Sequence, residues 1–455
     1  MHRFALDHLE EWATRRTRKP LVLRGARQVG KSTLVRHLAR NSFQKLVELD
    51  FERDPDLVSL FTGDPRETLR RLELRFDCSI VPGETLLFFD EIQAAPAVLG
   101  ALRYFHEELP EFHIVAAGSL LEVLLQAPTF SMPVGRIEYM HLGPMSFEEF
   151  LLASSKDRLL AFIQGLAPDG HIPLAIHRQL LGLLRQFMVV GGMPEAVSTY
   201  LAGSYRDCEI VQQSILSTYQ DDFGKYGRRA SHARLVKVYR KLPRLVGTRF
   251  KYIHVDRQER SKNLAAALHL LCLARVAHKV RHTSSNGLPL AAEARDDKFK
   301  LLFLDGGLVM RALGLGLLDL ERDEDVLLVN AGALGEQLVG QHLLYSAAPY
   351  VEPELHFWAR DKRNSSAEVD YVIAEGSAIV PVEVKSGKSG SLRSLHLFLR
   401  EKERRLGVRL NSDAPSLLSD VATLHDGTRF DYRLLSLPLY MVGQVRRLVR
   451  ELTAA

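Results

Sequence analysis

A glycine-rich stretch at residues 25–32 constrains the fold more than any other feature of this chain. It reads Gly-Ala-Arg-Gln-Val-Gly-Lys-Ser and matches the pattern GxxxxGK[ST] in full. An apolar run, Leu21–Leu23, precedes it and a helical run, Thr33–Ala39, follows it, which is the strand–loop–helix context that this pattern requires. Glycine lets successive backbone N–H groups turn inward around an anion, and the helix N-terminus adds further donors. The stretch therefore predicts a nucleoside-triphosphate site beside a parallel α/β sheet.

The chemistry of the pattern gives individual loop residues a role. Lys31 is expected to reach the β- and γ-phosphates, and Ser32 is expected to place its hydroxyl on Mg²⁺. The predicted nucleotide contacts are Gly25, Ala26, Arg27, Gln28, Val29, Gly30, Lys31, Ser32 and Thr33. The alternative is a glycine-rich turn with an exposed lysine, which the flanking strand and helix disfavour.

Two acidic residues follow a second apolar run, Leu86–Phe89. Asp90 and Glu91 are then expected at the carboxyl end of a buried strand, where parallel sheets bind their ligands. Asp90 is predicted to hold Mg²⁺ through water, and Glu91 to orient and deprotonate the attacking water. An Asp-Glu pair after an apolar run means little alone, but together with the loop it predicts ATP hydrolysis.

Two further residues are candidates for the catalytic machinery. Ser119 follows the apolar run Ile114–Ala117 and is predicted to sense the γ-phosphate or to place the attacking water. Capping of the next helix is an equal alternative for this serine. Arg136 is predicted to be an arginine finger that acts on the nucleotide of a neighbouring subunit, with an ordinary surface arginine as the alternative. The finger would require a homo-oligomer.

The order of elements predicts an α/β protein. The first 145 residues alternate apolar runs with helical patterns, as in a parallel sheet covered by helices. The predicted strands there are Pro20–Arg24, Lys45–Phe51, Thr85–Asp90, His113–Ala117 and Ile137–His141. From Ser146 to about Ser217 the pattern is predicted to be helical, with a break at residues 191–194. Residues 228–310 are predicted to mix helices with a polar, turn-rich segment, and a unit of about 145 residues follows. That last unit contains a helix near Gly335–Tyr345, strands near residues 368–374 and 379–385, and a helix after Ser391.

A second polar cluster is predicted near the C-terminus. Because side chains alternate along a strand, Glu383 and Lys385 share one face, and Asp370 can meet them across a hairpin. Two carboxylates suit one or two divalent ions, and the lysine can assist a metal-bound water. The alternative is a solvated hairpin face with a salt bridge between Glu383 and Lys385.

Taken together, these motifs resemble those of prokaryotic AAA+-type ATPases that carry a C-terminal domain with a restriction-endonuclease-like core. The matching segments are residues 25–32, 88–93, 118–119, 135–136, 142–150, 191–195, 299–301, 305–308 and 367–387. The resemblance implies four regions: an AAA+ core (1–145), a helical lid (146–227), a winged-helix-like region (228–310) and a PD-(D/E)xK domain (311–455). It also implies Asp370, Glu383 and Glu336 as ligands of Mg²⁺ or Mn²⁺, with Lys385 as a catalytic residue.

Two functions are compatible with these predictions. The first is an ATPase that gates a metal-dependent nuclease on nucleic acid, with DNA preferred over RNA. The second is a binding switch, in which ATP changes the state of a C-terminal domain that holds nucleic acid or a protein partner without cleaving. The intact set of Asp370, Glu383 and Lys385 favours the first. The near balance of 60 Lys and Arg against 55 Asp and Glu keeps the second open, because no strong basic stripe is evident.

Composition also indicates a compartment. The N-terminus carries Asp7, Glu10 and Glu11, which is unlike a signal peptide. The most apolar stretch, residues 264–277, is shorter than the ~20 residues that a membrane span needs. Three well-separated cysteines suit a reducing compartment. We therefore expect a cytoplasmic protein without a membrane partner.

Overall fold

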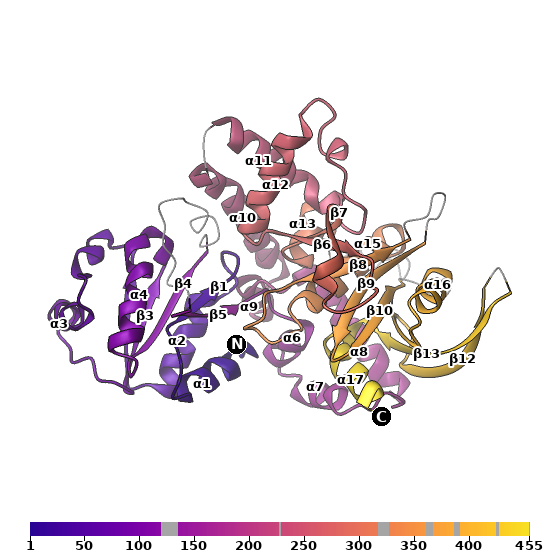
Figure 1. Cartoon of the computed structure of the whole chain (residues 1–455), viewed down its shortest axis with the longest axis horizontal. Helices are drawn as coiled ribbons and strands as arrows, with labels where there is room; N and C mark the ends of the chain where they lie inside the picture. Colours follow the sequence, from indigo (N-terminus) through magenta and orange to yellow (C-terminus); the bar gives the residue numbers. More distant parts are fainter. Residues whose placement is uncertain are drawn as a thin grey trace. The chain divides into compact units, whose positions relative to one another are not determined.

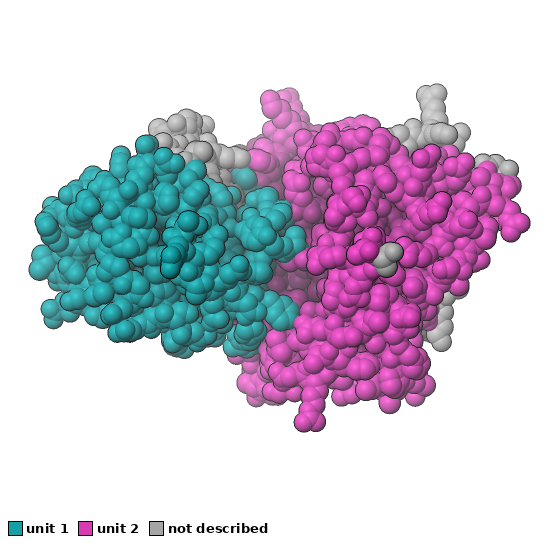
Figure 2. All heavy atoms as spheres, turned by 60° about the horizontal axis from the view of Figure 1, so that its bottom comes forward, with its two compact units in different colours: residues 1–143, 273–276, 347–353 teal, residues 144–272, 277–346, 354–455 magenta. Residues whose placement is uncertain are grey.

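The computed structural model of this chain consists of two compact units (Figure 2). Unit 1 comprises residues 1–143, 273–276 and 347–353. Unit 2 comprises residues 144–272, 277–346 and 354–455. The structure describes residues 1–119, 135–226, 229–316, 327–360, 367–385, 392–424 and 427–454.

Unit 1 contains a five-stranded parallel sheet with the strand order β2-β3-β4-β1-β5 (Figure 1). Its strands are β1 (Leu21–Arg24), β2 (Lys45–Asp50), β3 (Thr85–Asp90), β4 (His113–Gly118) and β5 (Glu138–His141). The predicted parallel sheet is therefore confirmed, with strand ends within one or two residues. Its helices are α1 (Ala5–Thr14), α2 (Lys31–Ser42), α3 (Pro65–Phe76) and α4 (Pro96–Glu108), with short 3₁₀ helices η1 (Pro55–Leu60) and η2 (Ile92–Ala94).

The core of unit 1 surrounds β3, whose six residues are all buried. A continuous apolar run is typical of a parallel strand with both faces covered. Phe89 of this strand lies edge-to-face against Phe51, Phe61 and Phe105, with ring centroids 5.4–6.4 Å apart. This packing fixes the carboxyl end of β3, and with it the position of Asp90.

Unit 2 begins with a helical region. A capping box between Ser146 and Glu149 starts its first helix, because the serine accepts from the Glu149 N–H and the glutamate accepts from the Ser146 N–H. The helices are α6 (Phe147–Ala153), α7 (Asp157–Gln164), α8 (Leu174–Val190), α9 (Pro194–Leu201), α10 (Tyr205–Asp222), η3 (Phe223–Tyr226), α11 (Arg229–Lys241), η4 (Leu242–Arg244), η5 (Tyr252–His254) and α12 (Ser261–Leu273). The predicted helical middle is confirmed.

An eight-stranded mixed sheet forms the rest of unit 2, in the order β12-β13-β11-β10-β9-β8-β6-β7. The strands are β6 (Ala277–Thr283), β7 (Ala294–Phe303), β8 (Leu355–Ala359), β9 (Glu368–Glu375), β10 (Ala378–Val384), β11 (Leu406–Asn411), β12 (Ser416–Thr423) and β13 (Arg429–Pro438). The accompanying helices are η6 (Leu290–Glu293), α13 (Gly306–Ala312), α15 (Leu327–Leu344), α16 (Arg393–Glu401), η7 (Leu439–Gln444) and α17 (Val445–Ala454).

The hairpin that follows α12 belongs to this large sheet. Its strands β6 and β7 pair with each other, and β6 also pairs in parallel with β8. The strands that a winged helix would use as its wing are thus integrated into the eight-stranded sheet. The winged-helix interpretation of residues 228–310 stays a prediction.

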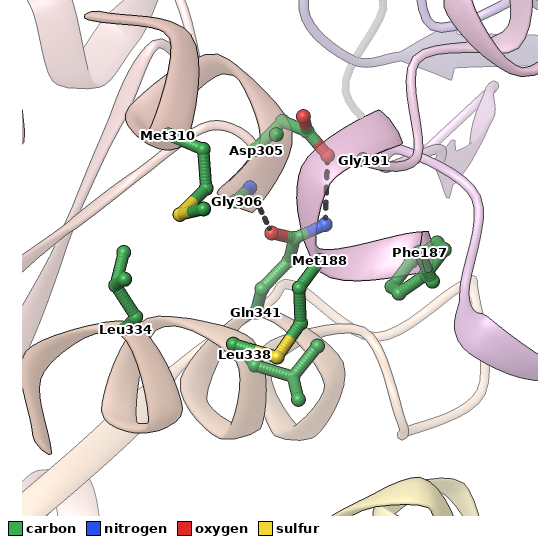
Figure 3. A pocket seen from close by; sticks show the side chains of 10 residues that line it. Phe187, Met188, Gly191, Asp305, Gly306, Met310, Leu334, Leu338 and Gln341 are labelled. Atoms are coloured by element: carbon green, nitrogen blue, oxygen red, sulfur yellow. Dashed lines mark hydrogen bonds between the residues drawn. The ribbon is translucent and has the colours of Figure 1, made fainter. Parts of the chain in front are cut away.

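A buried carboxylate, Asp305, joins three helices of unit 2 (Figure 3). It accepts hydrogen bonds from the Leu308 N–H at the start of α13 (3.0 Å), the Gly192 N–H (2.7 Å) and the Gln341 side chain of α15 (3.3 Å). A Cβ on Gly191 would lie 2.1 Å from the Asp305 Oδ1, so only glycine fits there. The adjoining cavity of about 10 Å³ is no larger than a single water needs. Gly191-Gly192 and Asp305-Gly306-Gly307 therefore serve the packing of these helices against one another.

Among the helices that the structure describes, none combines the length and the apolar character that crossing a membrane would require.

Candidate nucleotide site and carboxylate cluster

The glycine-rich loop links β1 to α2, as its sequence pattern predicts. Gly30 has φ +93° and forms the N-cap of α2, a left-handed conformation that favours glycine. Gly25 lies so close to the segment after β5 that a Cβ would be 2.3 Å from the Leu142 carbonyl oxygen. The two glycines therefore serve different purposes: one turns the chain and the other permits close backbone packing.

Lys31 is buried within this loop. Its Nζ donates hydrogen bonds to the carbonyl oxygens of Gly25 (3.1 Å) and Ala26 (2.8 Å). The ammonium group thus lies inside the curve of the loop, at the residue for which phosphate contact is predicted.

Ser32 and Asp90 meet at the carboxyl edge of the sheet. The Ser32 hydroxyl hydrogen-bonds to the Asp90 carboxylate, and the Glu91 N–H donates to Asp90 Oδ1 (3.0 Å). Burial raises the pKa of Asp90, the Ser32 hydrogen bond lowers it, and the Glu91 charge raises it again. The structure therefore brings together the two residues predicted to hold Mg²⁺ at the nucleotide.

Glu91 directly follows β3 and has φ +48°, a conformation that few side-chain-bearing residues adopt. Its carboxylate accepts a hydrogen bond from the Gln93 side chain on η2. Gln93 was not predicted from the sequence, although its position two residues after Glu91 was a usable signal. The contact holds the Glu91 side chain at the end of the strand.

Ser119 and Arg136 lie in different surroundings. Ser119 is buried directly after β4, while the helix that it was suggested to cap falls outside the described residues. Arg136 is exposed, and its Nε lies 2.7 Å from the Glu107 Oε1 on α4. Both catalytic assignments remain predictions.

Arg3 is a residue at this site that the sequence did not reveal. It is buried, and its guanidinium donates to the Val29 carbonyl (2.9 Å) and the Gly143 carbonyl (2.8 Å). The Leu142 N–H donates to the Arg24 carbonyl (2.8 Å). Arg3 thus connects the phosphate loop to Gly143, the last residue of the first sequence segment of unit 1.

A second unpredicted group lies at the end of β5. The His141 Nε2 is 3.2 Å from Glu352, which also pairs with the Arg275 guanidinium. Burial lowers the pKa of His141 to about 4 despite the opposing charge of Glu352, so this histidine is neutral at pH 7. Since its members are far apart in sequence, no local pattern indicated this group.

The C-terminal polar cluster forms on the β9–β10 hairpin. Val382 pairs with Tyr371, and the Val384 N–H, two residues further along β10, donates to the Asp370 Oδ2 (2.9 Å). The Lys385 Nζ lies 2.6 Å from the Glu383 Oε1. The predicted hairpin thus brings the three polar residues to one place on the sheet.

An unpredicted lysine occupies the centre of this cluster. The Nζ of Lys300, on β7, lies 2.7 Å from Glu368, 3.0 Å from Glu336 and 3.3 Å from Asp370. Only 3% of its side chain is exposed. An ammonium group has three donors, and three carboxylates surround this one. Lys300 therefore stands where the sequence predicted a divalent cation.

The predicted metal site at Glu336, Asp370 and Glu383 is not found. Across the described ranges, no group of three or more His, Cys, Asp or Glu residues is arranged to hold a metal ion. The physical reason is that lysines already pair with these carboxylates: Lys300 contacts Glu336 and Asp370, and Lys385 contacts Glu383. A strand far from the hairpin supplies Lys300, so the local pattern gave no sign of it.

The electrostatics of the cluster follow from its burial. Burial, together with the nearby Asp370 charge, raises the pKa of Glu336 to about 8 and that of Glu383 to about 7. Burial would lower the pKa of Lys300, but the surrounding carboxylates outweigh it and keep the lysine charged. One oxygen of Glu383 is buried without a hydrogen-bond partner in the described structure. The cluster therefore contains carboxyl groups that retain protons near neutral pH, as well as the charged Lys300 ammonium.

Comparison with known protein families divides the chain into three segments. Residues 17–151 match a model described as "AAA domain". Residues 181–319 and 331–421 match two models, each described as a domain of unknown function (DUF8612 and DUF4143, respectively). The protein thus carries an AAA domain of P-loop type, followed by two domains of unknown function. No curated protein matches the sequence.

Solved structures give only distant similarity. The chain aligns with C. elegans PCH-2 at 14% identity and TM-score 0.25, covering 43% of this chain and 59% of that one. It aligns with a signal-transduction ATPase with a tetratricopeptide-repeat sensor from Pyrococcus horikoshii at 12% identity and TM-score 0.25, covering 75% and 54%. The ORC2 protein of Aeropyrum pernix aligns at 13% identity and TM-score 0.20, covering 60% and 84%. Similarity at this level supports no conclusion about function.

Proposed function

We propose that this protein binds and hydrolyses ATP at residues 25–33 and uses the nucleotide to control a binding module in unit 2. The observation that carries the ATPase proposal is the contact between the Ser32 hydroxyl and the Asp90 carboxylate beside the buried Lys31. Lys31 and Ser32 lie at the start of α2 and Asp90 lies at the end of β3, as phosphate and magnesium binding in an AAA domain requires.

The residues at this site suit ATP with Mg²⁺. Gly30, with φ +93°, turns the loop into α2, and α2 presents its N-terminal N–H groups to a phosphate. Lys31 supplies a positive charge to the β- and γ-phosphates, and Ser32 with Asp90 would hold the metal. Mg²⁺, when bound, neutralises charge on the phosphates. Glu91 takes the proton from the attacking water.

Two variants test this assignment. Lys31→Ala should weaken ATP binding by at least tenfold, because it removes the charge that faces the phosphates. Glu91→Gln should bind ATP nearly as the parent does, yet lose most turnover, because the amide keeps the shape and loses the base. Affinity measured with a fluorescent ATP analogue and turnover measured as phosphate release separate the two effects. The matched controls are Lys45→Ala and Glu84→Gln, at exposed positions of unit 1.

Turnover at the parent rate in Glu91→Gln would contradict the role of Glu91. Equal losses in the control variants would show that charge removal in unit 1 is harmful wherever it occurs.

For unit 2, we propose a module that holds its partner without cleaving it. The supporting observation is Lys300, since an ammonium group within 3.3 Å of three carboxylates competes with any divalent cation. A phosphodiester hydrolase of the predicted type needs such a cation to activate water. The module therefore corresponds to the switch predicted from the sequence.

A metal-dependent nuclease remains the second candidate, because Asp370, Glu383 and Lys385 lie together on the β9–β10 hairpin. The deciding assay incubates the protein with Mg²⁺ or Mn²⁺ and labelled single- and double-stranded DNA and RNA, with and without ATP. We expect no cleavage. Cleavage that disappears in Asp370→Ala while ATP turnover persists would establish the nuclease and refute the non-cleaving module.

A further inference from the structure

A strongly basic segment runs through the helical part of unit 2. Residues 231–262 contain ten Lys and Arg against two Asp and Glu, a net charge of +8 in a chain whose total is +5. The segment extends from α11 through η4 and η5 to the start of α12, where the upper helices are drawn in Figure 1. Its exposed basic residues are Lys237, Arg240, Arg244, Arg249, Lys251, Arg257, Arg260 and Lys262.

Two ion pairs lie within this segment. Lys237 on α11 pairs with Asp256, and the Arg234 Nε lies 3.3 Å from the Glu259 Oε2. These two ion pairs involve both acidic residues of the segment and connect α11 to the loop that precedes α12. The remaining basic residues of the segment therefore have no acidic partner within it.

Five basic residues of this surface have no carboxylate partner within the described ranges. They are Arg244, Lys251, Arg257, Arg260 and Lys262, all exposed. The apolar residues of α12 face inward, since Leu264, Ala267, Leu268 and Leu271 are buried. The exposed end of α12 carries basic residues and no acidic residue in its first turn, and the positive end of the helix dipole adds to their field.

The chemistry of this surface fits a polyanion with closely spaced phosphates. Arginine supplies three of the five unpartnered charges, and its planar guanidinium can bind a phosphate with two hydrogen bonds. A membrane-binding face would also need several apolar side chains to insert between lipids. Ile253 is the one large apolar side chain exposed in residues 231–262. The composition therefore favours nucleic acid over an anionic membrane.

The basic segment also leads to the carboxylate cluster. Arg249 pairs with Glu368 and forms a backbone bridge to Lys300. A Cβ on Gly247 would lie 2.9 Å from Ala333 of α15 and 3.6 Å from the Glu336 carboxyl carbon. A polymer bound along this surface would thus pass beside the cluster that Lys300 neutralises.

We propose that residues 231–262 form a nucleic-acid-binding surface that contacts phosphates and reads no base sequence. The inference rests on the proposed role of unit 2 as a binding module, and it names the partner of that module. The surface binds through the unpartnered arginines and lysines, so its affinity falls steeply with salt.

The test removes four charges together. The surface variant carries Lys251→Gln, Arg257→Gln, Arg260→Gln and Lys262→Gln. The control variant carries Arg158→Gln, Arg178→Gln, Arg206→Gln and Arg400→Gln, which removes the same charge from exposed positions elsewhere in unit 2. Binding of a fluorescein-labelled 30-base-pair duplex of mixed sequence, and of single-stranded DNA and RNA of equal length, is followed by anisotropy between 50 and 300 mM salt.

We expect the surface variant to lose roughly 100-fold in affinity and up to ~3.6 units of the log–log salt slope for duplex DNA, at ~0.9 for each of the four charges. The control should lose less than about threefold. ATP turnover and the thermal midpoint of the surface variant should match the parent, which excludes misfolding as the cause.

Parent-like DNA binding by the surface variant would overturn the inference, as would an equal loss in the control. A parent that hydrolyses ATP but binds no nucleic acid would also refute this surface and leave the ATPase proposal intact. Binding to vesicles of anionic phosphatidylserine, with none to nucleic acid, would replace the partner proposed here by a membrane.

Discussion

Replacing Lys300 by methionine should destabilise unit 2 and create affinity for a divalent cation. Methionine keeps the length and flexibility of the side chain but removes the ammonium group that three carboxylates contact. The variant leaves Glu336, Glu368 and Asp370 buried or half-buried without their shared counterion. Like charges then repel each other in a region that water reaches poorly.

The magnitude follows from the burial of the group. Removing one partner of a buried ion pair costs about 3–5 kcal/mol, because the other partner stays desolvated. For a large domain, each kcal/mol lowers the thermal midpoint by about 2 °C, so the variant should melt roughly 6–10 °C below the parent. The loss should be smaller at pH 6 than at pH 8, since the pKa of Glu336 is about 8 and the carboxyl can take up a proton instead.

Calorimetry at pH 6 and pH 8, with and without Mn²⁺, measures both effects. Mn²⁺ should restore part of the midpoint in Lys300→Met and leave the parent unchanged, because a ligand that binds only the folded state stabilises it. The matched control is Lys262→Met, an exposed lysine on α12, which should shift the midpoint by less than 1 °C. A parent-like midpoint for Lys300→Met would refute the counterion argument. A Mn²⁺ response in the parent would show that Lys300 does not exclude the metal.

Other predictions follow from the two units. Gly25→Ala should abolish tight ATP binding, measured by analogue fluorescence, because its Cβ would be 2.3 Å from the Leu142 carbonyl oxygen. Between pH 6.5 and 8 the stability of the parent should fall by up to ~1.4 kcal/mol per unit, because folded Glu336, with its raised pKa of about 8, keeps a proton that the unfolded chain releases. Glu336→Gln should flatten that part of a denaturation profile. Mixing Arg136→Ala with Lys31→Ala subunits should restore part of the ATP turnover if Arg136 acts across an oligomer. Full turnover by a strictly monomeric Arg136→Ala protein would refute that role.

Features encoded by neighbouring residues were predictable from the sequence. The phosphate loop, its strand and its helix are contiguous, and the β9–β10 hairpin follows from two alternating runs joined by a short turn. Periodicity reports such local structure directly. The positions of Asp90 at the end of β3 and of Asp370 within β9 could be read in the same way.

Residues that act through distant partners were not predictable. Lys300 is thirty-six residues from Glu336 and seventy from Asp370, and only the eight-stranded sheet and the packing of α15 bring them together. Arg3 reaches Val29 and Gly143 in the same manner. Such contacts depend on tertiary packing, which a single sequence does not display.

The basic segment at residues 231–262 is a different case. Its positive charge can be counted from the sequence, but the net charge of the whole chain, with 60 basic against 55 acidic residues, does not reveal it. Residues 231–262 alone contain ten Lys and Arg against two Asp and Glu. Local charge density is therefore more informative here than net charge.

The division of unit 1 into three stretches of sequence limits how this ATPase can be exchanged between proteins. A fragment that ends at Gly143 contains the phosphate loop but lacks Arg275 and Glu352, the group that meets His141 at the end of β5. Recombination at a single point would separate β5 from these partners. Residues 1–143 alone are therefore not a complete nucleotide-binding unit. A fusion of this unit to another protein would also need residues 273–276 and 347–353.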